Sequence, residues 1–258
     1  MFRRLFPLSI MFLTACMPSG SMEYTSRASA LPDSLPPMKT FATAPVAAPQ
    51  RSNQDISRDF LDLTFRMESG RLLPYMTRFE GPITVRVSGN APSSLQSDLT
   101  KLLARLRNEA RIDIRQTTRA DANITINMIA RKTLQGSVPA AACFVVPHVQ
   151  SWDEFRKLRR TASVDWARLK KRDKVGIVMP GDVSPQEIRD CLHEELAQAI
   201  GPLNDLYRLP DSIFNDDNIH TVLTGFDMMI LRAYYAPELR NGMTREGVAR
   251  VLRQVWAR

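Results

Sequence analysis

The chain has 258 residues, a formal net charge of +8 at pH 7 and 44% hydrophobic residues. Some 200 of these residues follow a Pro-rich stretch, which is enough for one domain with a sizeable hydrophobic core. After the first fifteen residues no apolar run approaches the roughly 18 residues of a membrane-spanning helix, which excludes a multi-span membrane protein. We therefore expect the body of the chain to be soluble.

The chain begins MFRRLFPLSIMFLTAC, which has the order of an export signal. Arg3 and Arg4 form a positive n-region, and the nine mainly apolar residues 5–13 are too few to span a bilayer. Leu13-Thr14-Ala15-Cys16 resembles the lipobox of bacterial lipoproteins, whose cysteine is acylated, with palmitate among the chains. We expect a signal peptide over residues 1–15 and a lipid anchor on Cys16; an ordinary signal peptide with a chance cysteine is the alternative.

Met17 follows the cysteine, and lipoprotein sorting by analogy favours the outer membrane when Asp is absent there. We expect a cell-envelope protein that faces the periplasm. Residues 16–52 are rich in Pro, Ser, Ala and Thr, which predicts a disordered tether, with a folded β subdomain as the alternative. An exported protein rarely meets nucleic acid, so we expect no such partner despite the charge.

Two cysteines, Cys143 and Cys191, remain after lipidation of Cys16. The periplasm is oxidising, so an even remainder predicts a disulfide, with two separate buried thiols as the alternative. A basic run from Phe155 to Lys174 contains two aspartates and has mixed periodicity. We interpret it as a solvated helix face; a contact with anionic lipid headgroups is the alternative.

The domain from residue 53 to residue 258 begins with a helix, a strand and a second amphipathic helix. Several strands follow, and three helices with N-cap signals at Ser184, Thr224 and Thr244 come last. This order is α+β rather than alternating α/β. We expect helices over residues 53–68, 93–110, 185–200, 224–235 and 244–257, and strands over 81–89, 112–116, 122–130, 141–148 and 174–181.

The segment DCLHEELAQAIGPLND, residues 190–205, resembles the zinc helix of metzincin proteases, His-Glu-x-x-His-x-x-Gly-x-x-His. The position of the general base is held by Glu195 and that of the glycine by Gly201. The degenerate ligand positions hold Glu194, Gln198, Asn204 and the adjacent Asp205. Residues 212–214 stand where that family has its Met-turn. The resemblance implies a zincin-like (metzincin-like) single α+β domain with a mixed sheet and a degenerate active-site helix.

The chain also resembles a domain family of unknown function in proteobacterial secreted proteins and lipoproteins. The shared patterns are EEL.Q..G..ND at residues 194–205, SIFNDD at residues 212–217, and Y.P.L..GM at residues 235–243. That resemblance implies no known activity.

The ligand positions of the motif offer carboxylate and amide oxygens. Such a set is poor for zinc and better suited to calcium, so we expect no metal, with zinc or calcium as alternatives. A site made of His148, His193 and His220 is a further alternative. The same motif residues would also serve as a buried hydrogen-bond network that ties the helix end to residues 212–217.

These patterns predict a cell-envelope lipoprotein that is a non-catalytic, zincin-like binding module. Its partners would be the membrane, through Cys16, and a peptide, a protein or an envelope polymer. The first alternative is a metal-dependent, peptidase-like hydrolase with Glu195 as the catalytic general base. The second is a purely structural envelope protein.

Overall fold

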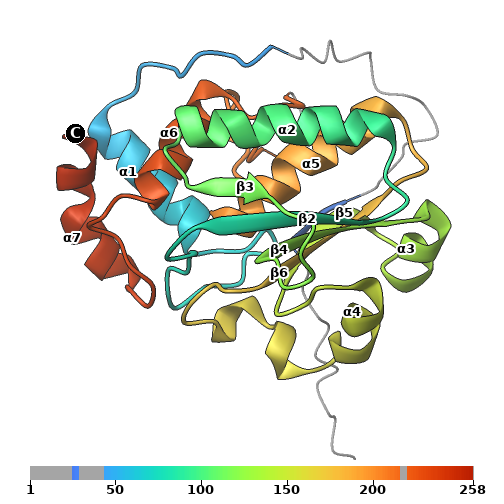
Figure 1. Ribbon diagram of the computed structural model, residues 1–258. Coiled ribbons are helices and arrows are strands. Elements are labelled where there is room, and N and C mark those ends of the chain that lie inside the picture. Colours follow the sequence, from blue (N-terminus) through green and yellow to red (C-terminus); the bar gives the residue numbers. More distant parts are fainter. Residues whose placement is uncertain (1–24, 29–43, 216–219, 258) are drawn as a thin grey trace, which may run out of the picture.

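The computed structural model of the protein describes residues 25–28, 44–215 and 220–257. It has an α+β architecture with one mixed sheet and helices on both faces (Figure 1). Cys16 and most of the expected tether lie outside the described residues. No helix within the described ranges is both long enough and apolar enough to cross a membrane.

Six strands form the sheet in the order β1-β5-β6-β4-β2-β3. Strands β2, β3, β4 and β6 run parallel, β5 is antiparallel to β6, and β1 is antiparallel to β5. The strands are β1 Thr25–Ala28, β2 Ile83–Gly89, β3 Ile114–Gln116, β4 Ile124–Ile129, β5 Ala141–Pro147 and β6 Val175–Pro180.

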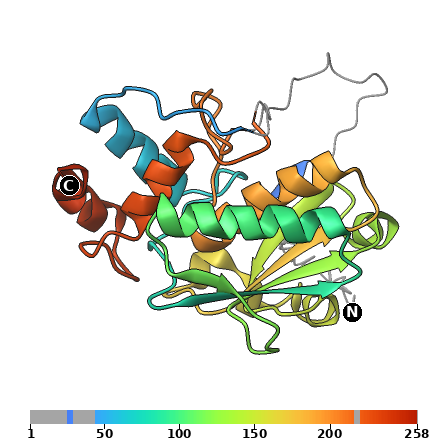
Figure 2. The same cartoon turned by 45° about the horizontal axis from the view of Figure 1, so that its top comes forward.

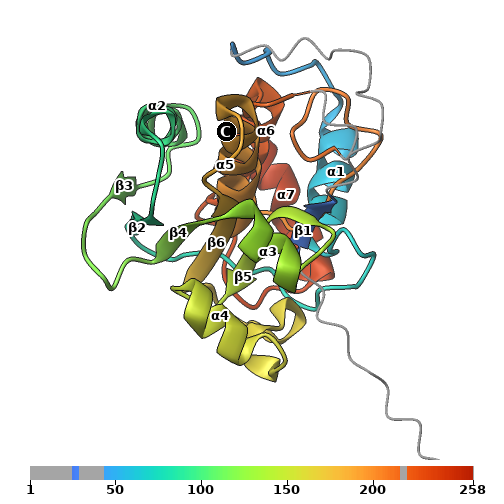
Figure 3. The same ribbon diagram turned by 90° about the vertical axis from the view of Figure 1, so that its right-hand side faces the viewer.

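Helices α2 and α5 cover one face of the sheet, and α3 and α4 cover the other (Figures 1 and 3). Helices α1, α6 and α7 gather beside the sheet, as the tilted view also shows (Figure 2). The helices are α1 Asn53–Thr64, α2 Ser93–Asn108, α3 Arg131–Ser137, α4 Trp152–Leu158, α5 Pro185–Ile200, α6 Gly225–Tyr234 and α7 Arg245–Trp256.

The core has two parts because side chains alternate across the sheet. In β5, Cys143 and Val145 join the larger cluster with α2, α5 and α1, whereas Phe144 and Val146 join a smaller cluster with α3 and α4. Strands β5 and β6 are buried on both faces, which explains why their sequences are apolar runs without alternation.

The helix ends follow the capping signals in the sequence. Ser184 and Glu187 form a capping box at the start of α5, and Thr224 and Asp227 form one at the start of α6. Gly201 ends α5 with φ −138° and ψ −135°. A Cβ atom at Gly201 would lie 2.6 Å from Cδ2 of Leu231 in α6, so close helix packing, rather than a left-handed turn, requires glycine there.

Parts of the chain differ from the sequence-based expectations. Residues 25–28 form a strand, and Val46 accepts a hydrogen bond from the N–H of Gly225 (2.7 Å), although both stretches fall within the expected tether. Helix α1 ends at Thr64, α3 was not expected, and the helix expected in the basic run is limited to α4, which ends at Leu158. In the basic run, Arg156 and Lys157 are exposed as expected, but Arg172 is buried.

The cysteine pair is confirmed: Cys143 of β5 and Cys191 of α5 form a disulfide across 48 residues. Closing a loop of this length removes chain entropy from the unfolded state, which corresponds to about 4 kcal/mol of stability. The Cys143→Ala/Cys191→Ala variant should therefore unfold at a clearly lower denaturant concentration than the oxidised wild type. Reducing agent should lower the midpoint of the wild type and leave the variant unchanged; equal midpoints would contradict the prediction.

Candidate functional site

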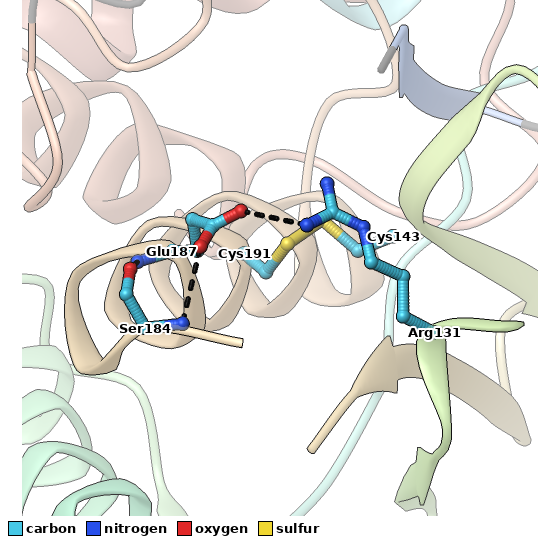
Figure 4. Close-up of a disulfide and its surroundings, with 5 residues drawn as sticks. All are labelled: Arg131, Cys143, Ser184, Glu187 and Cys191. Carbon is cyan, nitrogen blue, oxygen red and sulfur yellow. Dashed lines mark hydrogen bonds and ion pairs between the residues drawn. A yellow bond between two sulfur atoms is a disulfide. The ribbon is translucent and has the colours of Figure 1, made fainter. Parts of the chain in front are cut away.

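The expected site lies on α5, whose residues from Cys191 to Ile200 are all buried. The helix packs against β5, β6 and α2. Its N-terminal half is fixed by the disulfide, by the capping box, and by an ion pair from Arg131 to Glu187 at 3.3 Å (Figure 4). Polar side chains in the last three turns therefore face protein rather than bulk water, and their partners decide what they do.

The C-terminal end of α5 is capped by a buried guanidinium. Nη1 of Arg172 donates to the carbonyl oxygens of Gln198 (2.6 Å) and Ala199 (2.8 Å), and the guanidinium lies 4.8 Å from the centre of the Trp166 ring. The Tyr235 hydroxyl donates to the Ile200 carbonyl at 2.8 Å. A cation at this end interacts favourably with the helix dipole and satisfies carbonyls that have no partner within the helix.

Three carboxylates meet beside α5. One oxygen from each of Glu68, Glu194 and Asp205 lies within 4.8 Å of the other two. Glu194 is buried, and the other two are half-buried. Met67 and Leu203 form a parallel bridge, which aligns the segment after α1 with the segment after α5 and brings Glu68 close to Asp205.

Gln198 completes this carboxylate cluster. Its side chain is fully buried, and its Nε2 donates to Oε1 of Glu68 at 2.8 Å. Its Oε1 is also buried and has no hydrogen-bond partner within the described chain. Because Oε1 and Nε2 share one carbon, this unused acceptor lies at the edge of the cluster.

The two remaining motif residues, Asn204 and Glu195, are not part of the carboxylate cluster. Asn204 turns to α1 and donates from Nδ2 to the carbonyl of Asp62 at 3.0 Å. Glu195, the expected general base, is 0% exposed and is not one of the three clustered carboxylates. The structure thus brings Glu194, Gln198 and Asp205 together, and it places Asn204 and Glu195 elsewhere.

The three histidines contact three different backbone segments. Nδ1 of His193 accepts from the N–H of Leu223 at 3.0 Å, Nδ1 of His148 lies 2.8 Å from the Ser163 carbonyl, and Nε2 of His220 lies 2.8 Å from that of Pro210. Within the described ranges the one group of side chains close enough to share an ion contains none of these histidines.

Hydrogen bonds hold residues 212–214 against the first turn of α6. The Ser212 hydroxyl and the Ile213 N–H both donate to the carboxylate of Asp227, which is completely buried. Burial raises the pKa of Asp227, against the lowering effect of these hydrogen bonds. Gln198 and Asn204 bond to the segment around the end of α1, not to this loop; residues 216–219 lie outside the described chain.

Arginines from three separate segments converge on two acids of α1. Asp59 accepts from Arg51 (3.2 Å) and Arg208 (2.8 Å), and Asp62 accepts from Arg208 (2.6 Å) and Arg245 (2.7 Å). Burial raises the pKa of Asp62, but the hydrogen bonds from Arg245 and Arg208 outweigh it and hold the pKa below its usual value. These pairs fix the loop after α5 against α1, and so position Asp205.

Two important residues were missed by sequence reasoning. Glu68 lies in an irregular segment 126 positions before Glu194, and no local pattern marks it as a partner of the motif. Arg172 is one of many cations in the basic run, and only the tertiary structure distinguishes it from its exposed neighbours.

Burial of His193 lowers its pKa from 6.5 to about 3, with a further lowering by the charges of Arg105 and Arg189. Below pH 6.5 the unfolded chain therefore binds a proton here that the folded chain does not. Stability should fall by about 1.4 kcal/mol per pH unit from this group as the pH falls from 6.5 towards 3. Denaturant unfolding at several pH values checks this.

The control is His193→Asn, which keeps an acceptor for the Leu223 N–H but does not titrate. Its stability should depend on pH less steeply than that of the wild type, by about one proton. Equal slopes would show that His193 is not the group that is held neutral.

Comparison with known proteins identifies a family but no activity. Residues 53–254 match the family model described as a protein of unknown function, DUF2927. Neither the curated proteins nor the solved structures contain a match. The matched region includes strands β2 to β6, helices α1 to α6, all but the last two residues of α7, the carboxylate cluster and the disulfide. The chain therefore belongs to the DUF2927 family of proteins of unknown function.

Proposed function

We propose that the protein is a non-catalytic, zincin-like binding module of the cell envelope, in which the carboxylate cluster beside α5 holds a hard cation such as calcium. The observation that carries this proposal is the convergence of Glu68, Glu194 and Asp205 within 4.8 Å. Two of these residues come from the motif that resembles a zinc helix. The third comes from a distant segment and adds another oxygen donor.

The donors fit calcium better than zinc. Protein zinc sites are dominated by imidazole and thiolate, whereas calcium takes six to eight oxygen ligands from carboxylates, amides, carbonyls and water. Glu68, Glu194 and Asp205 supply carboxylates, and Gln198 supplies a buried amide oxygen without a partner within the described chain. The half-buried positions of Glu68 and Asp205 leave room for water ligands.

Electrostatics also favour a cation here. Two carboxylate charges about 4 Å apart repel by about 1 kcal/mol in water and about 4 kcal/mol in the partly buried conditions of a protein surface. A divalent cation among three carboxylates is attracted by each of them, and this attraction offsets their mutual repulsion. The bound ion would join α5 to the segments after α1 and after α5, and so order the surface that meets a protein, peptide or envelope polymer.

The hydrolase alternative has less support from the geometry. A general base must lie within hydrogen-bond reach of the water that it activates. Glu195 holds the position of the base in the motif, but its carboxylate is not one of the three that cluster beside α5. The carboxylates that reach the half-buried cluster belong to other residues, so we assign Glu195 a role inside the fold.

Two features support the cell envelope as the location. Residues 1–16 have the order of a lipoprotein export signal that ends at Cys16. The Cys143–Cys191 disulfide is of a kind that persists in oxidising compartments such as the periplasm and is rare in the cytosol.

The proposal predicts that calcium stabilises the full chain in chelator-treated buffer. At a concentration of about 100 times its Kd, calcium should add about 2.7 kcal/mol to the free energy of unfolding. Glu194→Gln and Asp205→Asn should each remove most of this response. Thermal unfolding with and without calcium measures the effect, and titration calorimetry gives the stoichiometry.

Asp113→Asn is the matched control, because Asp113 is exposed and lies outside the cluster. Its response to calcium should equal that of the wild type. The absence of stabilisation by calcium in the wild type, or equal stabilisation in the cluster variants, would contradict the cation site. Stoichiometric zinc that is lost on Glu195→Gln would instead favour the hydrolase.

A further inference from the structure

A cavity is lined by residues of α6, of the segment directly after it, of α7 and of the turn between α2 and β3. Its volume is about 450 Å3, within the range of about 300–1,000 Å3 that is typical of small-molecule pockets. Most of its wall is apolar and includes Met229, Ala233, Pro237, Val255 and Trp256. It shares no residue with the carboxylate cluster.

The two aromatic walls of the cavity are fixed from behind. The Trp256 indole donates from Nε1 to Oγ of Ser57 at 2.8 Å and packs edge-on against Phe60, with ring centres 6.0 Å apart. The Tyr235 hydroxyl is bonded to the Ile200 carbonyl. A ligand would therefore enter a preformed site and would not have to order these rings.

The charge of the cavity comes from two arginines. Arg111 and Arg232 line it, both are exposed, and neither makes a hydrogen bond or ion pair within the described chain. By contrast, the nearby Arg105 binds Glu109 through two hydrogen bonds, of 2.7 and 2.9 Å. No acidic residue lines the cavity, so an incoming anion would meet two guanidinium groups without a competing carboxylate.

Arg111 has an unusual backbone conformation. Its φ is +57°, a left-handed conformation that non-glycine residues adopt uncommonly and at a cost in free energy. Arg111 follows directly after Ala110, which is buried and also lines the cavity. The turn at Ala110 and Arg111 therefore places an apolar side chain and a cation next to each other in the wall of the cavity.

We propose that this cavity binds an amphipathic carboxylate of the fatty-acid class. The apolar wall would take the hydrocarbon chain, and Arg111 and Arg232 would bind the carboxylate through charge-assisted hydrogen bonds. Guanidinium groups match a carboxylate with paired N–H donors, which a neutral alcohol would not use in the same way. This proposal is independent of the cation site.

Isothermal titration of decanoate into the full chain, in buffer without detergent, tests the proposal, with decanol as the uncharged comparison. We expect one decanoate per chain, bound at least about 10-fold more tightly than decanol, since a hydrogen bond to a charged group contributes about 1.5–3 kcal/mol. The Arg111→Gln/Arg232→Gln variant should reduce decanoate affinity about 10-fold or more and leave decanol affinity nearly unchanged.

Arg250→Gln/Arg253→Gln is the matched control, because it removes the same two charges from exposed positions of α7 outside the cavity wall. It should bind decanoate like the wild type, and thermal unfolding should show that the variants are folded. Replacement of Met229 by Asp should abolish the binding of both ligands. Absence of decanoate binding to the wild type, or equal decanoate affinity in the double arginine variant, would overturn the proposal.

Discussion

The organisation of the protein depends on the burial of α5. Its residues from Cys191 to Ile200 are inside the fold, so each backbone or side-chain polar group there needs an internal partner. Arg172 and Tyr235 satisfy carbonyls at the C-terminal end, and the Leu223 N–H satisfies Nδ1 of His193. These partners come from the segment between β5 and β6 and from the chain after α5, so the placement of α5 determines how distant parts of the chain meet.

Although residues 190–205 resemble a zinc helix, their buried polar side chains differ from those of a zinc helix in ligand chemistry and in partners. The spacing of Glu194 and Gln198 places both side chains on one face, as in the metzincin motif that the segment resembles. The chemistry at those positions is oxygen-based, and the structure adds Glu68 rather than an imidazole. Glu195 is fully buried, although its position in the motif is that of a general base. This arrangement is the basis for our proposal that the cluster holds a cation.

Local signals predicted much of the fold. The capping boxes at Ser184 and Thr224 predicted where α5 and α6 begin, because each uses residues only three positions apart. The apolar runs predicted β5 and β6, and the cysteine count predicted the disulfide that links β5 to α5. Glu68 and Arg172 escaped prediction because their roles depend on contacts across 126 and 26 residues, which leave no periodicity in the sequence. The short helix α3 escaped because seven residues give too little pattern, and the mixed periodicity of the basic run did not show that its helix ends at Leu158.

If the carboxylates beside α5 hold a hard cation, crystals of the protein grown with calcium should reveal it in anomalous diffraction data. We expect an anomalous peak between Glu68, Glu194 and Asp205, with ligand oxygens about 2.3–2.6 Å away and the Gln198 amide oxygen turned towards the ion. Well-ordered carboxylates with no peak among them, or a peak that appears only with zinc at other residues, would show that the cluster is not a calcium site.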